Sequence, residues 1–190
     1  MFDTVFGVPT HPLVVHAVVV LLPLAALGGV AVALVPALRR RYGPLVGAAA
    51  AGAVVSVLAA TRSGEELYAR QSARFGPEQA EEAGLMERHR ELAEQLLPWT
   101  VVLLAGIALV VVTPLVARRT QRALVPAGGA PAGEPAAPAW QRPVAVLGIV
   151  VTLVGAVLSL VLVVRSGHLG SEAAWNRSTT APAASAQLRG

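Results

Sequence analysis

Residues 96–117 of this chain read LLPWTVVLLAGIALVVVTPLVA, a stretch without one charged side chain. A bilayer core of about 30 Å needs about 20 apolar residues at the helical rise, so this stretch is long enough to cross a membrane. Three further segments qualify, at residues 13–38, 44–61 and 143–164. None has Asp, Glu, Lys or Arg in its interior, and each helix satisfies its own backbone hydrogen bonds in lipid. The sequence therefore predicts an all-α fold, a bundle of four transmembrane helices.

Composition excludes several classes of protein. The 190 residues are 55% hydrophobic. The net charge is +4, and the arginines that supply the positive charge are spread over several short segments between the spans. Without a basic face or a binding motif, nucleic acid is excluded as a partner, and the lipid bilayer is the partner that the spans imply. Cysteine is absent, which excludes disulfides, iron–sulfur clusters and covalently attached c-type haem.

The arginine pattern predicts the orientation in a bacterial cytoplasmic (inner) membrane. Arg39–Arg41 follow the first span, and four further arginines lie between spans three and four, at Arg118, Arg119, Arg122 and Arg142. Basic residues in short loops stay on the cytoplasmic side, so both termini are expected outside. No basic residue precedes the first span, and we therefore expect it to remain in the mature protein rather than serve as a cleaved signal peptide.

The remaining segments differ in kind. Residues 1–12 are expected to form an extracytoplasmic segment, 13–175 the membrane domain, and 176–190 a disordered tail. Residues 118–142 are rich in Pro and Gly, which predicts a flexible cytoplasmic loop. In residues 78–97 apolar positions recur at helical spacing opposite a charged face, which predicts an amphipathic outer helix before span three.

All four histidines lie near span ends on the predicted outer face: His11, His16, His89 and His168. His16 is one turn inside span one, where an imidazole needs a partner for its nitrogens, and His89 points with the apolar stripe of its helix. His11 and His16 are five residues apart, about 140° around a helix, so they do not form a chelate by themselves. His89 would approach His16 only if Pro98 kinks the helix.

Arg-Ser-Gly ends both span two, at 62–64, and span four, at 165–167. The glycines favour a left-handed helix cap, and the arginines complement the helix dipole. The recurrence indicates a parallel repeat of two hairpins, spans one and two against spans three and four.

Three motifs together resemble an uncharacterised bacterial membrane family, domain of unknown function 2231. They are Gly-x-Pro-x-His-Pro-x-x-Val-His from Gly7, a histidine before span three, and Ser-Gly-His-x-Gly from Ser166. The resemblance extends from Gly7 to Trp175 and implies four helices with no established activity. This chain has Gly170-Ser171 and Ala174-Trp175 where many members have a paired glycine and a Val-Tyr.

Two hypotheses about function remain open. In the first, the outer histidines hold a b-type haem for electron transfer with a membrane redox partner. His16 and His89 are the expected axial pair, with His168 and His11 as alternates. The same histidines with Glu65 or Glu172 would instead bind zinc or copper.

In the second hypothesis, the chain is a structural or accessory protein without a cofactor. The histidines then dock the outer segments, and small-residue seams support helix association or a homo-oligomer. A transporter is disfavoured because no ionisable residue lies at mid-membrane. Whether the chain is an enzyme stays open; nothing orients Ser63, Ser166 or Ser171 as a nucleophile, so no catalytic residue is assigned.

Overall fold

The computed structural model describes residues 4–5, 8–72, 80–123 and 138–180. Its elements are a two-residue strand pair and four helices: β1 (Thr4–Val5), β2 (Val8–Pro9), α1 (Thr10–Leu34), α2 (Pro36–Ser72), α3 (Ala80–Ala123) and α4 (Gln141–Thr180). Each helix contains a part that is long and apolar enough to cross a membrane. The predicted all-α bundle with four membrane spans is confirmed, and the small antiparallel pair before α1 was not predicted.

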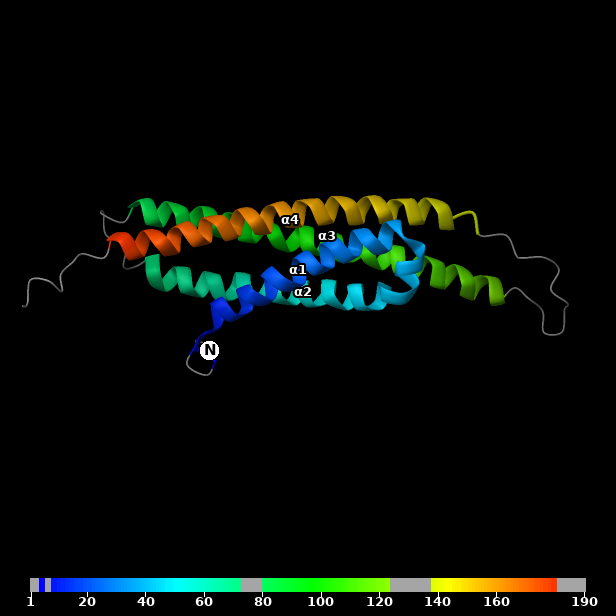
Figure 1. Cartoon of the computed structure of the whole chain (residues 1–190), viewed down its shortest axis with the longest axis horizontal. Helices are drawn as coiled ribbons and strands as arrows, with labels where there is room; N and C mark the ends of the chain where they lie inside the picture. The colour runs from blue at the N-terminus through cyan, green and yellow to red at the C-terminus, as the bar shows by residue number, and fades with distance from the viewer. Residues whose placement is uncertain (1–3, 6–7, 73–79, 124–137, 181–190) are drawn as a thin grey trace, which may run out of the picture.

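The helices form an elongated bundle in which each follows its predecessor back along the long axis (Figure 1). α1 packs chiefly on α2, and α3 on α4, so the bundle consists of two hairpins that run in the same direction. Glycine lets the second hairpin close tightly. A Cβ at Gly106 would lie 2.5 Å from the backbone nitrogen of Thr152, and one at Gly155 would lie 2.7 Å from that of Leu103.

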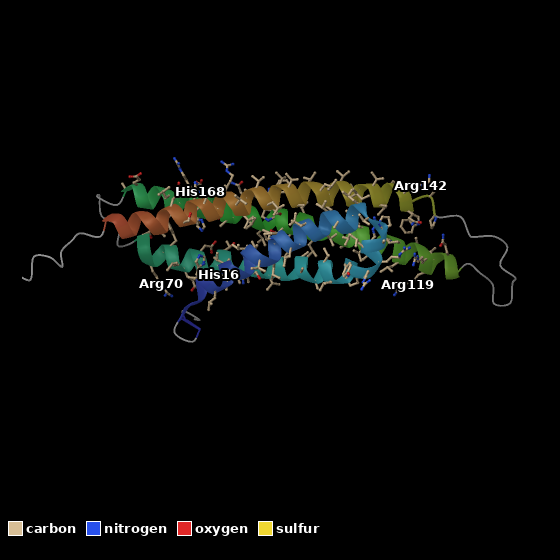
Figure 2. All side chains as sticks on the ribbon, in the orientation of Figure 1. His16, Arg70, Arg119, Arg142 and His168 are labelled. Carbon is tan, nitrogen blue, oxygen red and sulfur yellow. The ribbon has the colours of Figure 1, made fainter. Side chains whose placement is uncertain are left out.

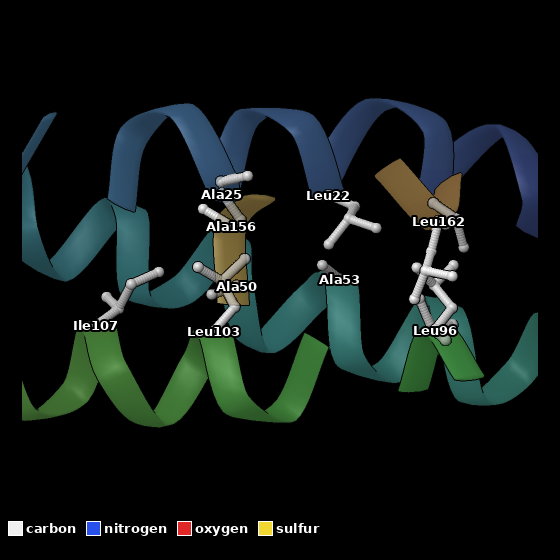
Figure 3. Close-up of a cluster of buried hydrophobic side chains, with 12 residues drawn as sticks. Leu22, Ala25, Ala50, Ala53, Leu96, Leu103, Ile107, Ala156 and Leu162 are labelled. Carbon is white, nitrogen blue, oxygen red and sulfur yellow. The ribbon is translucent and has the colours of Figure 1, made fainter. Parts of the chain in front are cut away.

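The centre of the bundle consists of small and medium side chains from all four helices (Figure 3). Leu22, Leu103 and Ile107 are fully buried, and alanines at 50 and 53 of α2 let that helix approach the others. Other leucines point outward, as at Leu27, which is 63% exposed. An apolar exterior around a small-residue interior is typical of helices packed within lipid.

The turn between α1 and α2 differs from the prediction. α1 ends at Leu34 and α2 begins at Pro36, so the arginines after the predicted span 13–38 lie in the first turns of α2 rather than in a loop. Pro36 suits a first helical position because its missing N–H has no partner to lose. Arg39 closes the preceding helix: its Nε donates to the carbonyl oxygen of Val32 at 3.0 Å and its Nη2 to that of Ala33 at 2.8 Å.

The predicted helix caps at the Arg-Ser-Gly segments are also wrong. α2 continues past Gly64 to Ser72, and α4 continues past Gly167 to Thr180, beyond the predicted start of the disordered tail at residue 176. The helices continue because an uninterrupted ladder satisfies the backbone, and single glycines cost a helix only about 1 kcal/mol each. Residues 181–190 and 124–137, which include most of the predicted tail and loop, lie outside the described residues.

The outer segment before span three belongs to the same helix as the span. α3 is continuous from Ala80 through Pro98, so the proline does not separate the two parts. Residues 78 and 79 lie outside the described residues, and the amphipathic character of 78–97 stays a prediction.

The two ends of the bundle differ in chemistry (Figure 2). We call the end that carries His11, His16, His89 and His168 the histidine end. The opposite end, which carries exposed arginines of α2, α3 and α4, is called the arginine end; its members are Arg40, Arg41, Arg118, Arg119 and Arg142.

Candidate two-histidine site

His11 lies in the first turn of α1 and contacts α2. Its Nδ1 is 3.0 Å from Oγ of Ser63, and that hydroxyl in turn donates to the carbonyl oxygen of Ala60 at 3.1 Å. With the hydroxyl hydrogen directed at Ala60, Nδ1 of His11 is the donor in its own bond. The ring lies against the helix at Gly64, where an added Cβ would be 3.1 Å from Cε1 of His11.

His89 makes a similar contact in the second hairpin, from α3 to α4. Its Nδ1 lies 2.8 Å from the carbonyl oxygen of Ser166 and 3.2 Å from Oγ of the same residue. A carbonyl oxygen only accepts, so Nδ1 of His89 also carries its hydrogen. The ring lies against Gly170, where an added Cβ would be 3.2 Å from Cε1. The two hairpins therefore present the same contact, a histidine on the serine of an Arg-Ser-Gly segment.

These hydrogen bonds determine whether Nε2 of each histidine carries a hydrogen or a lone pair. In a neutral imidazole one nitrogen carries the hydrogen and the other a lone pair. With Nδ1 of His11 and His89 both acting as donors, both Nε2 atoms carry the lone pair. A histidine oriented by a hydrogen bond from its second nitrogen is the usual arrangement of a metal ligand.

Both imidazoles line one cavity of about 70 Å³ at the histidine end. All four helices contribute to its wall, which is mostly apolar and includes Val18 of α1, Val57 of α2, Leu96 of α3 and Val163 of α4. The cavity therefore brings together two imidazoles from helices that are far apart in the sequence.

The sequence predicts His16 beside His89. In the structure it is His11, not His16, that lines the cavity together with His89. The ring of His16 is exposed, and its Nδ1 donates to the carbonyl oxygen of Pro12 in its own helix at 2.6 Å. The reason is the helical register: with His11 turned toward the bundle, a residue five positions later points about 140° away.

The remaining candidates lie outside the cavity. His168 is exposed on α4 and pairs with Glu172, with Nε2 and Oε1 3.2 Å apart. Glu65 is exposed on α2. Among the described residues, no group of three or more His, Asp or Glu side chains is placed to hold a metal ion. The polar side chains among the residues that line the cavity are the two imidazoles and the hydroxyls of Thr61 and Ser166.

Sequence reasoning overlooked the role of Ser63 and Ser166. In the sequence they stand out only as nucleophiles or as parts of helix ends, whereas in the structure each orients a histidine. The recurrence of Arg-Ser-Gly at 62–64 and 165–167 carried the signal, because a segment repeated in both hairpins predicts equivalent contacts in both.

Fold and site define a four-helix membrane protein with paired histidines at one end of its bundle. Residues 7–181 match the model of a family described as predicted membrane protein (DUF2231), and the chain belongs to that family. No curated protein and no solved structure matches the chain.

Proposed function

We propose that this membrane protein binds a transition-metal ion of the zinc or copper kind through Nε2 of His11 and Nε2 of His89. The observation that carries the proposal is that two imidazoles line one cavity, each oriented by a hydrogen bond at Nδ1 that leaves Nε2 as the nitrogen able to bind a metal. Neutral imidazole is a favoured ligand of both metals. Copper would give the site an electron-transfer role with a membrane redox partner; zinc would link the two hairpins at this end of the bundle.

The size of the cavity favours a metal ion over a b-type haem. Ligand pockets for organic molecules of drug size measure about 300–1,000 Å³. The cavity here, about 70 Å³, has room for an ion and a few waters, since about 10–15 Å³ of such space is enough for one water. Waters would complete the coordination that two imidazoles leave open. A haem would require the four helices to separate at this end.

Metal titration of the purified full-length chain tests the proposal. The protein in neutral detergent, stripped with a chelator, is titrated with Zn²⁺ and separately with Cu⁺ under reducing conditions. We expect one ion per chain, lost in His11→Ala and in His89→Ala and retained in the matched controls His16→Ala and His168→Ala. Loss in the controls, or retention in both site variants, contradicts the assignment. A Soret band in the absorption spectrum would show that the protein binds haem and would contradict the proposal of a metal ion.

The competing function is a purely structural one, and the small number of ligands favours it. Two imidazoles alone are fewer than the three protein ligands of catalytic zinc sites. In this case the histidine–serine contacts only fasten α1 to α2 and α3 to α4. Absence of stoichiometric metal together with lower thermal stability of His11→Ala and His89→Ala would support it.

We also propose that the histidine end faces the outside of the cytoplasmic membrane, because the arginine end suits the cytoplasmic side. The chain has no cysteine, so single cysteines report cleanly on topology. Ser72→Cys at the histidine end is expected to react with a membrane-impermeant maleimide in intact cells, and Thr120→Cys only after lysis. The opposite labelling pattern would invert the orientation.

A further inference from the structure

Among the residues that the structure describes, the arginine end carries positive charge and no acidic side chain. In the sequence, no Asp or Glu occurs in residues 36–61, 96–121 or 138–165, while Glu134 falls outside the described residues. At the histidine end, by contrast, arginines alternate with glutamates, as in the contact of Arg90 with Glu87 at 2.8 Å. The two ends thus differ strongly in electrostatic potential, although the net charge of the chain is only +4.

Three helices bring the exposed arginines to this end. Arg40 and Arg41 lie in the first turns of α2, Arg118 and Arg119 near the end of α3, and Arg142 at the start of α4. All five side chains are exposed. Arg39 is different because its guanidinium is bonded to the last carbonyls of α1.

Aromatic side chains mark the depth of this end in the bilayer. Tyr42 and Trp140 are 41% and 40% exposed, and the guanidinium of Arg41 lies 5.4 Å from the centre of the Tyr42 ring. Tyr and Trp prefer the headgroup level of a membrane. The arginines beside them are therefore at the height of lipid phosphates.

We propose that the arginine end binds the phosphodiester headgroups of anionic phospholipids through Arg40, Arg41, Arg118 and Arg119. Guanidinium groups form paired hydrogen bonds with phosphate oxygens, and clusters of arginine beside membrane spans attract anionic lipid. Partners of this chemistry also include free phosphate, which lacks acyl chains and gains nothing from the apolar helix surfaces below.

Lipid binding to the purified full-length chain tests this. In neutral detergent, binding of phosphatidylglycerol and of phosphatidylcholine is measured by native mass spectrometry and by titration of fluorescent analogues. We expect phosphatidylglycerol to bind more tightly, and each arginine to contribute up to about fivefold in affinity. The variant R40Q/R41Q/R118Q/R119Q is expected to lose at least about tenfold.

The matched control is R62Q/R70Q/R88Q/R165Q, which removes the same charge from exposed positions at the histidine end. It is expected to retain the preference for phosphatidylglycerol. Equal affinity for the two lipids, or an equal loss in both variants, overturns the proposal, as does full competition by millimolar inorganic phosphate. If the first variant does not fold, the wild type decides: screening by 0.5 M NaCl must weaken phosphatidylglycerol binding and leave phosphatidylcholine binding unchanged.

Discussion

His89 donates its Nδ1 hydrogen to the backbone carbonyl of Ser166, whereas His11 in the other hairpin donates to a serine side chain. Otherwise the two contacts are alike: each joins the helices of one hairpin, and each orients a ring that lines the shared cavity. The difference means that a change at the serine side chain affects the two histidines unequally. Comparison of the two serine variants therefore distinguishes loss of the group that orients a histidine from loss of a hydroxyl alone.

Ser63→Ala is expected to weaken metal binding about 10–100-fold, the usual effect of losing a group that orients a ligand. Without Oγ, Nδ1 of His11 loses the acceptor that fixes both its tautomer and its ring. Ser166→Ala keeps the carbonyl acceptor of His89 and is expected to change affinity less than about threefold. Isothermal titration with the metal that the wild type binds measures both. Equal effects of the two variants would show that the serine side chains act in some other way.

Gly64→Ala and Gly170→Ala are expected to displace the rings of His11 and His89. The new Cβ would lie 3.1 Å and 3.2 Å from the respective Cε1 atoms, so each ring must move by a few tenths of an ångström. We expect about tenfold weaker metal binding in each case. Gly167→Ala is the control, because an added Cβ there meets nothing within 4 Å. If the control weakens binding as much as the other two, altered helix flexibility is the cause.

The sequence was sufficient for the four spans but not for the choice between His11 and His16. Apolar length alone defines a span, and residues 96–117 leave no alternative in lipid. The register of α1 against its neighbours depends on side-chain packing. Leu22 and Ala25 are buried in the bundle, and His11 lies on the same face of the helix as they do. Spacing showed that only one of the two histidines could face the bundle, and tertiary packing selected the first.

The glycines of the Arg-Ser-Gly segments show a second limit. Glycine ends helices in water-exposed turns, and the prediction of caps at Gly64 and Gly167 followed that preference. In the bundle, Gly64 serves close approach instead, since it makes room for the ring of His11. A local preference cannot reveal a contact with a residue 53 positions away, although the repetition of the segment pointed to one.

Gly106→Ala and Gly155→Ala are expected to destabilise the second hairpin without touching the site. Each new Cβ would lie under 3 Å from backbone atoms of the facing helix, which cannot rotate away as a side chain can. Overpacking of this kind costs about 1–3 kcal/mol. Gly47→Ala is the control because its Cβ meets nothing within 4 Å. Thermal unfolding in detergent measures the stability of all three variants. Unchanged stability of both interface variants would mean that α3 and α4 do not approach as closely as the structure shows.

Metal binding is expected to stabilise the folded bundle as well. A ligand that binds only the folded state at 100 times its dissociation constant adds about 2.7 kcal/mol to the free energy of unfolding. Thermal unfolding of the wild type and of His168→Ala is therefore expected to shift upward when the metal is added. His89→Ala is expected to show no shift while still folding, because His11 and Ser63 remain in contact in the first hairpin. A shift that persists in His89→Ala would place the ion elsewhere, and no shift in the wild type would favour the structural role of the histidine–serine contacts.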